Sequence, residues 1–147
     1  MLGDVEVKYL LYADDLVLLA ASPEQLQSAL DRLITYARRN RLVVNVQKTK
    51  CMTFYNGSCP QRDFFFDGQR LENCNSFTYL GIVFTTRLSS SKHVDYIVSK
   101  CNSRIGYLFS TLCLQDIPLG VALDVFKTYI LPIITYGLPI WLSLIHI

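Results

Sequence analysis

The sequence predicts an α+β protein with a β-rich first part and a helical second part. Up to residue 84 the apolar residues mostly follow strand patterns, with one strongly amphipathic helix among them. After the serines at residues 89–91 the apolar residues recur at helical spacing instead. The change near residue 88 therefore divides the chain into a β-rich part, residues 1–88, and a helical part, residues 89–147.

The first predicted element is a β-hairpin whose turn is acidic. Alternating apolar residues lead up to Tyr12, and an uninterrupted apolar run, residues 16–21, follows the turn, as is typical of a strand buried on both faces. Asp14 and Asp15 are a poor choice for such a turn, which favours Asn-Gly or Asp-Gly. Adjacent carboxylates suit Mg²⁺ and hence phosphoryl transfer, with a solvated acidic turn as the alternative.

A helix is predicted from residue 23 to residue 39, covering the hairpin. Ser22 is a suitable N-cap, Pro23 fits the first helical position, and Gln25 completes a capping box. Asn40 is expected to end the helix in a left-handed conformation. The apolar positions recur at helical spacing: Leu26, Ala29, Leu30, Leu33, Ile34 and Ala37.

Three further β segments are predicted before residue 88. Residues 42–55 are extended, with a break near Gln47 and Lys48, and a hairpin turns at Asp67-Gly68. A last β segment covers residues 77–84, where Gly81 marks a tight bend.

Two helices are predicted in the second part. An apolar stripe defines the first helix, and Pro118 begins the second helix, which Pro132 must kink or end. The stripe consists of Val94, Ile97, Val98, Cys101, Ile105, Leu108 and Leu112.

Composition narrows the function classes. The net charge is +2, but acids predominate up to Asp31 and seven bases with no acid follow from Arg32 to Arg62, which favours a polyanionic partner or a solvated surface.

Five cysteines without C-x-x-C spacing indicate reduced thiols in an intracellular protein. His93 and His146 stand alone, so we expect packing or surface roles. Residues 128–147 carry no formal charge, but prolines and a glycine interrupt them, so we expect no membrane span.

Together these residues resemble the reverse transcriptases of LINE-type (non-LTR) retrotransposons over nearly the whole chain. Tyr12-Ala13-Asp14-Asp15 looks like that family's catalytic palm hairpin, and residues 42–50 look like its next palm motif. Residues 77–81 resemble the primer grip, and residues 125–141, including Tyr136-Gly137 and Trp141, are similar to the thumb. The resemblance implies part of a right-hand polymerase palm with its primer grip, residues 1–88, and a partial helical thumb, residues 89–147.

The resemblance also implies an RNA-directed DNA polymerase with Mg²⁺, replaceable by Mn²⁺, as cofactor. Asp14 and Asp15 would be the metal ligands, and Lys48 would face the leaving pyrophosphate. Tyr12 would pack under the primer end, and Ala13 is small enough to let the duplex approach. An RNA template, a DNA primer and deoxynucleoside triphosphates would be the partners.

Six further residues are expected to contact nucleic acid by the same resemblance. Tyr79, Leu80 and Gly81 would press against the primer strand. Lys92, Lys100 and Arg104 would meet duplex phosphates without reading sequence.

Other parts of the family pattern lie before this hairpin. The family has a third catalytic carboxylate, a nucleotide pocket and fingers motifs there, whereas eleven residues precede Tyr12 here. We therefore expect the N-terminal half of the polymerase to be missing and this chain to be inactive by itself. A non-catalytic nucleic-acid-binding relic is the alternative. Residues 143–147 do not continue the thumb pattern.

Overall fold

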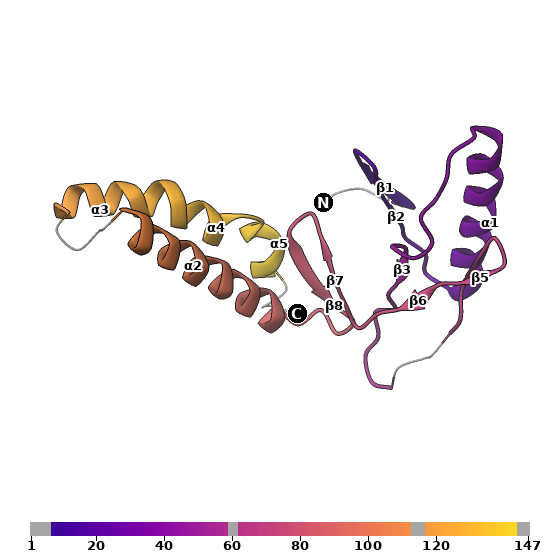
Figure 1. Ribbon diagram of the computed structural model, residues 1–147. Coiled ribbons are helices and arrows are strands. Elements are labelled where there is room, and N and C mark those ends of the chain that lie inside the picture. Colours follow the sequence, from indigo (N-terminus) through magenta and orange to yellow (C-terminus); the bar gives the residue numbers. More distant parts are fainter. Residues whose placement is uncertain (1–6, 59–61, 113–116, 144–147) are drawn as a thin grey trace. The chain divides into compact units, whose positions relative to one another are not determined.

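The computed structural model describes residues 7–58, 62–112 and 117–143, and within them it combines helices with four two-stranded sheets (Figure 1). Of these residues, 7–51 and 62–74 form one compact unit, and 52–58, 75–112 and 117–143 form a second one. The elements in chain order are β1 (Tyr9–Tyr12), β2 (Asp15–Leu18), α1 (Pro23–Arg39), β3 (Lys50–Cys51), β4 (Phe65–Phe66), β5 (Gln69–Arg70), β6 (Glu72–Asn73), β7 (Ser76–Tyr79), β8 (Ile82–Thr85), α2 (Ser91–Leu112), α3 (Leu119–Val125), the π-helical η2 (Phe126–Ile130), α4 (Leu131–Thr135) and α5 (Leu138–Ser143).

The secondary structure changes from strand to helix close to residue 88. The last strand, β8, ends at Thr85, and α2 begins at Ser91. The compact units are divided at other points, because residues 52–58 return to the second unit, where the Tyr55 N–H donates to the Thr86 carbonyl at 3.1 Å. The division into palm and thumb at residue 88 stays a prediction.

Helix α1 begins with the predicted cap. The Ser22 hydroxyl accepts from the Gln25 N–H at 3.3 Å, and Pro23 occupies the first helical position. The Gln25 side-chain oxygen accepts from the Ala21 N–H at 3.2 Å, one residue before the N–H that a standard capping box uses. The N–H groups of Ala21 and Gln25 are thus both satisfied by side chains three or four residues away.

The end of α1 differs from the prediction. Asn40 has a φ of −96°, and the left-handed residue is Arg41, with a φ of 54°. The Leu42 N–H then donates to the Ala37 carbonyl at 2.9 Å, which is the closing bond of a Schellman motif. Asn40 instead uses its side-chain amide to donate to the Tyr36 carbonyl at 2.8 Å, so the reversal falls one residue later.

The core of the first unit lies between α1 and the short strands β3 to β6. Leu71 is 1% exposed, and Gln27 of α1 both donates to the Phe65 carbonyl (2.9 Å) and accepts from the Phe65 N–H (3.1 Å). The Asp67-Gly68 turn joins β4 and β5 as predicted, with positive φ at both residues. The buried cluster consists of Leu30, Cys51, Phe64, Phe66 and Leu71.

The β1–β2 hairpin is less buried than predicted. Its second strand is four residues long, and Leu16 and Leu19 are each 40% exposed, so the predicted strand buried on both faces over residues 16–21 is wrong for this structure. Leu18 packs against the core cluster, which includes Leu30 of α1, while α1 contacts β4 more extensively than it contacts the hairpin. The physical reason is that β1 and β2 pair with each other and with no other strand of the described residues.

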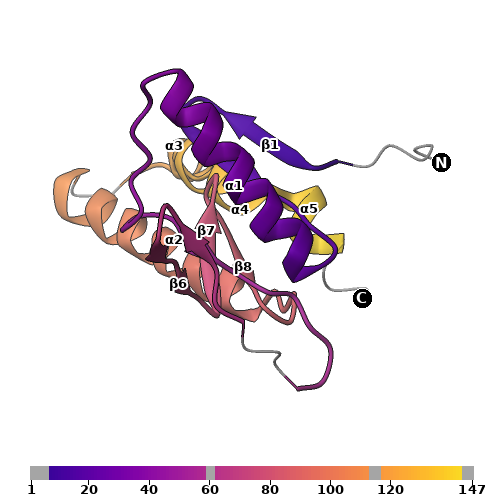
Figure 2. The same cartoon turned by 90° about the vertical axis from the view of Figure 1, so that its right-hand side faces the viewer.

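In the second unit, α2 packs beside a returning helical run and beside strand β8 (Figure 2). Cys101 and Leu108 of the predicted stripe are buried against Ile130. Val94, Val98 and Ile105 are exposed, so the stripe is wider than the surface that α2 buries. No helix within the described residues is long and apolar enough to cross a membrane.

Pro132 changes the helix without ending it. The returning run continues from α3 through η2 into α4, and the π-helical turn ends at Ile130, two residues before Pro132. Because proline has no N–H to donate, the preceding turn widens and the run continues at a new register. The run ends at Thr135, after which Tyr136 is extended and Gly137 has a φ of 66°.

Candidate functional site

The acidic turn lies at the exposed tip of the β1–β2 hairpin. Tyr12 and Asp15 are paired across the strands, with Ala13 and Asp14 as the two turn residues. All four residues are exposed. Ala13 has a φ of 52°, a left-handed conformation that costs a non-glycine residue about 1–2 kcal/mol. The tip therefore presents two adjacent carboxylates on a locally strained turn, and strain of this kind is concentrated at functional sites.

The register of the hairpin sets which side chains share a face. Tyr12 and Asp15 are directly opposite each other, so their side chains point to the same side of the two-stranded sheet. Tyr9 and Leu18 are also paired and lie on the other side, where Leu18 packs against the core cluster. The Tyr12 ring and the Asp15 carboxylate therefore lie on the side away from that core contact.

These carboxylates fit a hard divalent cation in chemistry and access. Mg²⁺ takes oxygen ligands and keeps several waters, so one or two carboxylates with open solvent beside them form a usual partial site. Within the described residues, no group of three or more His, Cys, Asp or Glu residues is arranged so that it could hold a metal ion.

Lys48 lies in a turn that Asn45 organises. The Lys48 N–H donates to the Asn45 side-chain oxygen at 3.1 Å, and the Thr49 N–H donates to the Asn45 carbonyl at 3.1 Å. The predicted break near residues 47–48 is confirmed as a turn over residues 46–48, and the Lys48 side chain is exposed. Sequence reasoning missed the role of Asn45, although asparagine is a residue type whose side chain often accepts from the N–H three residues on, as a helix N-cap does.

The basic stretch that the sequence singled out is partly neutralised. Arg38 forms an ion pair with Asp67, and Lys50 forms one with Glu72. These acids lie beyond the stretch in sequence but beside it in the fold. The charge asymmetry seen along the chain is therefore weaker in space than it is in sequence.

In the second unit, the β7–β8 hairpin turns at the predicted residues. Leu80 has a φ of 47° and Gly81 one of 78°, so both turn residues are left-handed. Tyr79 precedes them and pairs with Ile82. This is the geometry of the preferred two-residue hairpin turn, but leucine adopts it at a cost that glycine does not pay.

A groove of about 760 Å³ brings four of the predicted nucleic-acid contacts together. Leu80 and Gly81 line it from the hairpin tip, and Lys100 and Arg104 line it from α2. The Lys100 ammonium lies 4.5 Å from the centre of the Tyr96 ring, a cation–π contact that holds the charge at the groove wall. The groove also contains the side chains of Ser99, Ser103, Tyr107 and Tyr136.

Lys92 is separate from this groove. It lies in the first turn of α2 and donates to the Ser76 hydroxyl at 3.4 Å. The resemblance grouped Lys92 with Lys100 and Arg104 as contacts for duplex phosphates, whereas in the structure Lys92 is at the base of the hairpin.

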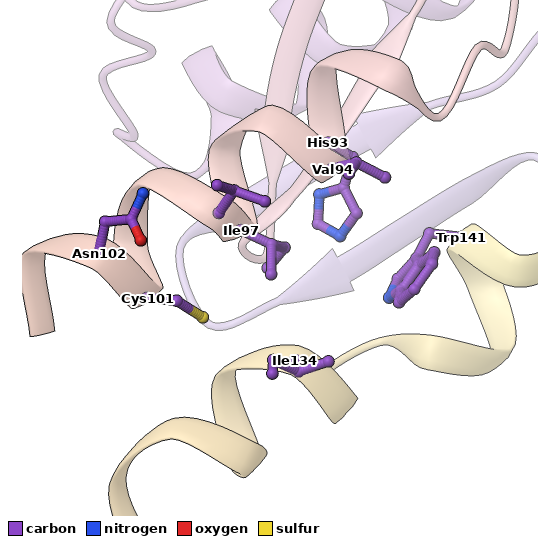
Figure 3. Close-up of a pocket in the computed structure, with 8 residues that line it drawn as sticks. His93, Val94, Ile97, Cys101, Asn102, Ile134 and Trp141 are labelled. Atoms are coloured by element: carbon purple, nitrogen blue, oxygen red, sulfur yellow. The ribbon is translucent and has the colours of Figure 1, made fainter. Parts of the chain in front are cut away.

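His93 has a packing role, as predicted. It is 1% exposed, its Nδ1 accepts from the Val83 N–H at 3.2 Å, and its ring lies 5.9 Å from the ring of Trp141. Burial, and secondarily the charge of Lys100, lowers the His93 pKa, so the ring is neutral at physiological pH. Figure 3 shows His93 and Trp141 on the wall of an apolar cavity of about 330 Å³, with Ile97 and Ile134 beside them. His146 lies outside the described residues.

Cys51 is buried and Cys74 is partly buried in the first unit. Burial raises the pKa of Cys51 to about 11, and burial also raises the pKa of Cys74. Both thiols are therefore protonated at neutral pH.

The chain is similar to known proteins over most of its length. A family model described as "Reverse transcriptase (RNA-dependent DNA polymerase)" matches residues 1–84. The chain is 26% identical over 139 residues to "RNA-directed DNA polymerase from mobile element jockey" of Drosophila melanogaster, covering 88% of this chain and 15% of that protein. It is 30% identical to "Probable RNA-directed DNA polymerase from transposon BS" of the same organism, with the same coverage.

A third relative, the jockey polymerase of Drosophila funebris, is 24% identical over 149 residues, covering 95% of this chain. The chain thus spans about 15% of the length of the curated relatives it matches. These alignments cover more of the chain than the family model, whose match ends at residue 84 within β8. No solved structure matches the chain at a comparable level of significance.

Proposed function

The chain belongs to the reverse transcriptase family of RNA-dependent DNA polymerases and is similar to those of LINE-type mobile elements, and from this premise we propose that its two hairpin tips hold the metal ions and the primer end in template-directed DNA synthesis. The observation that carries the proposal is the β1–β2 tip, where Asp14 and Asp15 stand exposed on a strained turn. No structural requirement of a short hairpin explains two adjacent carboxylates there.

Asp14 and Asp15 are the proposed metal ligands, with Asp14 in the turn and Asp15 at the first position of β2. When bound, Mg²⁺, or Mn²⁺ in its place, supplies charge neutralisation for the nucleotide phosphates and the primer 3′ hydroxyl. The carboxylates hold the cation at a rigid point of the backbone, because Asp15 is paired with Tyr12 in the ladder. Tyr12, on the same face as Asp15, packs under the primer end.

Ala13 and Lys48 have proposed roles set by size and charge. Ala13 places a single methyl group at the tip, which leaves room for a duplex to approach the carboxylates. Lys48 presents an exposed ammonium on a turn fixed by Asn45, suited to stabilising or protonating a leaving pyrophosphate.

The groove of the second unit is the proposed track for the nucleic-acid backbone. Lys100 and Arg104 meet phosphates, and Leu80 and Gly81 press their backbone against the primer strand, with Tyr79 behind them. Lys92 meets phosphates nearer the base of the hairpin. An RNA template, a DNA primer and deoxynucleoside triphosphates are the proposed partners of the whole polymerase. The third metal ligand and the nucleotide pocket are proposed to come from polypeptide outside these 147 residues.

Metal titration tests the β1–β2 site. The 147-residue chain is expected to bind Mn²⁺ and Mg²⁺ with dissociation constants of about 1 mM or weaker, because two carboxylates leave most of the octahedral shell to water. Asp14→Asn is expected to abolish this binding, measured by Mn²⁺-enhanced water relaxation. Asp67→Asn, at the tip of the β4–β5 hairpin, is the matched control and is expected to leave it unchanged. Submicromolar binding, or equal loss in both variants, would show that the site has been misassigned.

Substitution of Lys48 tests its charge. In a polymerase that contains this segment, Lys48→Ala is expected to lower the single-turnover rate of nucleotide incorporation by about 10²–10⁴-fold, the usual range for a general acid, with a smaller change in apparent nucleotide affinity. Lys48→Arg keeps the charge and is expected to retain more of the rate. An effect confined to nucleotide affinity would make Lys48 a ground-state contact.

A further inference from the structure

Tyr136 connects the returning helices to the turn of the β7–β8 hairpin. It directly follows α4, and its hydroxyl donates to the Leu80 carbonyl at 2.7 Å. Its ring lies against the other turn residue, since a Cβ added to Gly81 would be 3.1 Å from the Tyr136 Cε1 atom. One side chain, 56 residues away in sequence, thus contacts both residues of the turn.

The turn needs such a partner because its conformation is unfavourable for one of its residues. Leu80 has a φ of 47°, where the Cβ of an L-residue crowds the neighbouring carbonyl. Two-residue turns of this kind favour asparagine, aspartate or glycine at the first position. Leucine has no side-chain group that bonds locally, so the stabilisation comes from outside the hairpin.

Tyr136 is itself held in place by contacts within the same unit. Its carbonyl accepts from the Trp141 indole N–H at 3.3 Å, and the Trp141 ring lies beside the ring of His93. His93 in turn accepts from the Val83 N–H of β8. Strand β8, helix α2 and the residues after α4 are therefore each in contact with the next, and Tyr136 connects the last of them back to the β7–β8 turn.

The same contacts explain why the residue after Tyr136 is a glycine. Gly137 has a φ of 66°, and a Cβ added to it would be 2.6 Å from the Ile82 Cδ1 atom. Ile82 is buried, so its side chain has little room to move. Tyr136 and Gly137 thus form a pair in which the tyrosine reaches the turn and the glycine lets the backbone come close enough.

We propose that Tyr136 is the positioning residue for the Leu80-Gly81 turn: it holds the turn in its left-handed conformation and so presents the turn's backbone to the primer strand. That the turn's backbone meets the primer strand rests on the proposed function, whereas the role of Tyr136 in holding the turn does not. A consequence is that the turn and the helices α2 and α4 move as one body, so a displacement of the helices also displaces the backbone that presses on the primer.

The experiment compares Tyr136→Phe with Tyr129→Phe in the 147-residue chain. Tyr136→Phe removes the hydroxyl and keeps the ring on Gly81, and Tyr129, exposed on η2, is the matched control. NMR couplings and Cα shifts of Leu80 report its φ. They are expected to show loss of the left-handed conformation in Tyr136→Phe alone. Adding Leu80→Gly to Tyr136→Phe is expected to restore the turn, because glycine adopts positive φ without support.

A binding measurement tests the role toward the primer. The wild-type chain is expected to bind a primer–template with a recessed 3′ end more tightly than a blunt duplex of equal length, measured by fluorescence anisotropy. Tyr136→Phe is expected to reduce this preference about three- to tenfold, the size of one lost hydrogen bond, and Tyr129→Phe to keep it.

The two measurements separate the possible failures. Unchanged Leu80 couplings in Tyr136→Phe would overturn the positioning role whatever the chain binds. Altered couplings with an unchanged preference would overturn the link to the primer. A wild-type chain without any preference would contradict the proposed function of the turn, while the couplings would still decide the role of Tyr136.

Discussion

The chain of residues 1–147 is expected to show no template-directed primer extension above an Asp14→Ala, Asp15→Ala control, with either Mg²⁺ or Mn²⁺. The β1–β2 tip is exposed to water, where the field of two carboxylates and a bound cation is strongly attenuated. Catalysis by fixed charges needs a preorganised, water-excluded site. A misplacement of about 1 Å of the reacting groups can by itself cost on the order of a hundredfold.

Complementation tests the same prediction through a gain of activity. A separately produced polypeptide that carries the preceding part of a related polymerase is expected to restore some extension when mixed with the wild-type chain, and none when mixed with the double alanine variant. The assay is incorporation on an RNA template with a DNA primer. Extension by residues 1–147 alone would contradict the view that the hairpin is one part of a larger active site.

The second large effect is expected from Gly137→Ala, which should destabilise the second unit by about 2–5 kcal/mol. A left-handed φ costs an alanine about 1–2 kcal/mol, and forcing a methyl group against buried Ile82 adds about 1–3 kcal/mol of overpacking. Urea unfolding followed by Trp141 fluorescence measures it, because Trp141 is the single tryptophan of the sequence.

Gly106→Ala is the matched control for this substitution. Gly106 lies inside α2, and an added Cβ there meets nothing within 4 Å. Alanine is favoured over glycine inside a helix, so the control is expected to stabilise the unit by about 0.5–1 kcal/mol. Equal effects of the two substitutions would show that the backbone at Gly137 is not constrained as the structure has it.

Several elements followed from the sequence because neighbours along the chain form them. The cap of α1 needs Ser22, Pro23 and Gln25 within four residues, and the Asp67-Gly68 turn needs two residues that accept positive φ. The β1–β2 and β7–β8 hairpins also have their turns where the pattern placed them. In each case the interactions that form the element lie within a few residues of one another.

The roles of single site residues depended less on pattern and more on resemblance. Nothing in the spacing of Lys48 or Lys92 distinguishes a functional lysine from a surface lysine. The structure does separate Lys92 from the other two basic residues of α2. Lys100 and Arg104 share a groove with the hairpin turn, and Lys92 does not. The resemblance had grouped Lys92, Lys100 and Arg104 together as phosphate contacts.

By itself, then, the sequence determined the N-cap of α1, the hairpin turns, the carboxylate pair and the family. The tertiary structure decided what no local pattern contains: the exposure of the β1–β2 hairpin, the burial of His93, and the contact of Tyr136 with Leu80. The physical reason is that burial and hydrogen bonding between distant residues depend on which surfaces meet in space. Residues 56 positions apart leave no periodic trace of a bond between them.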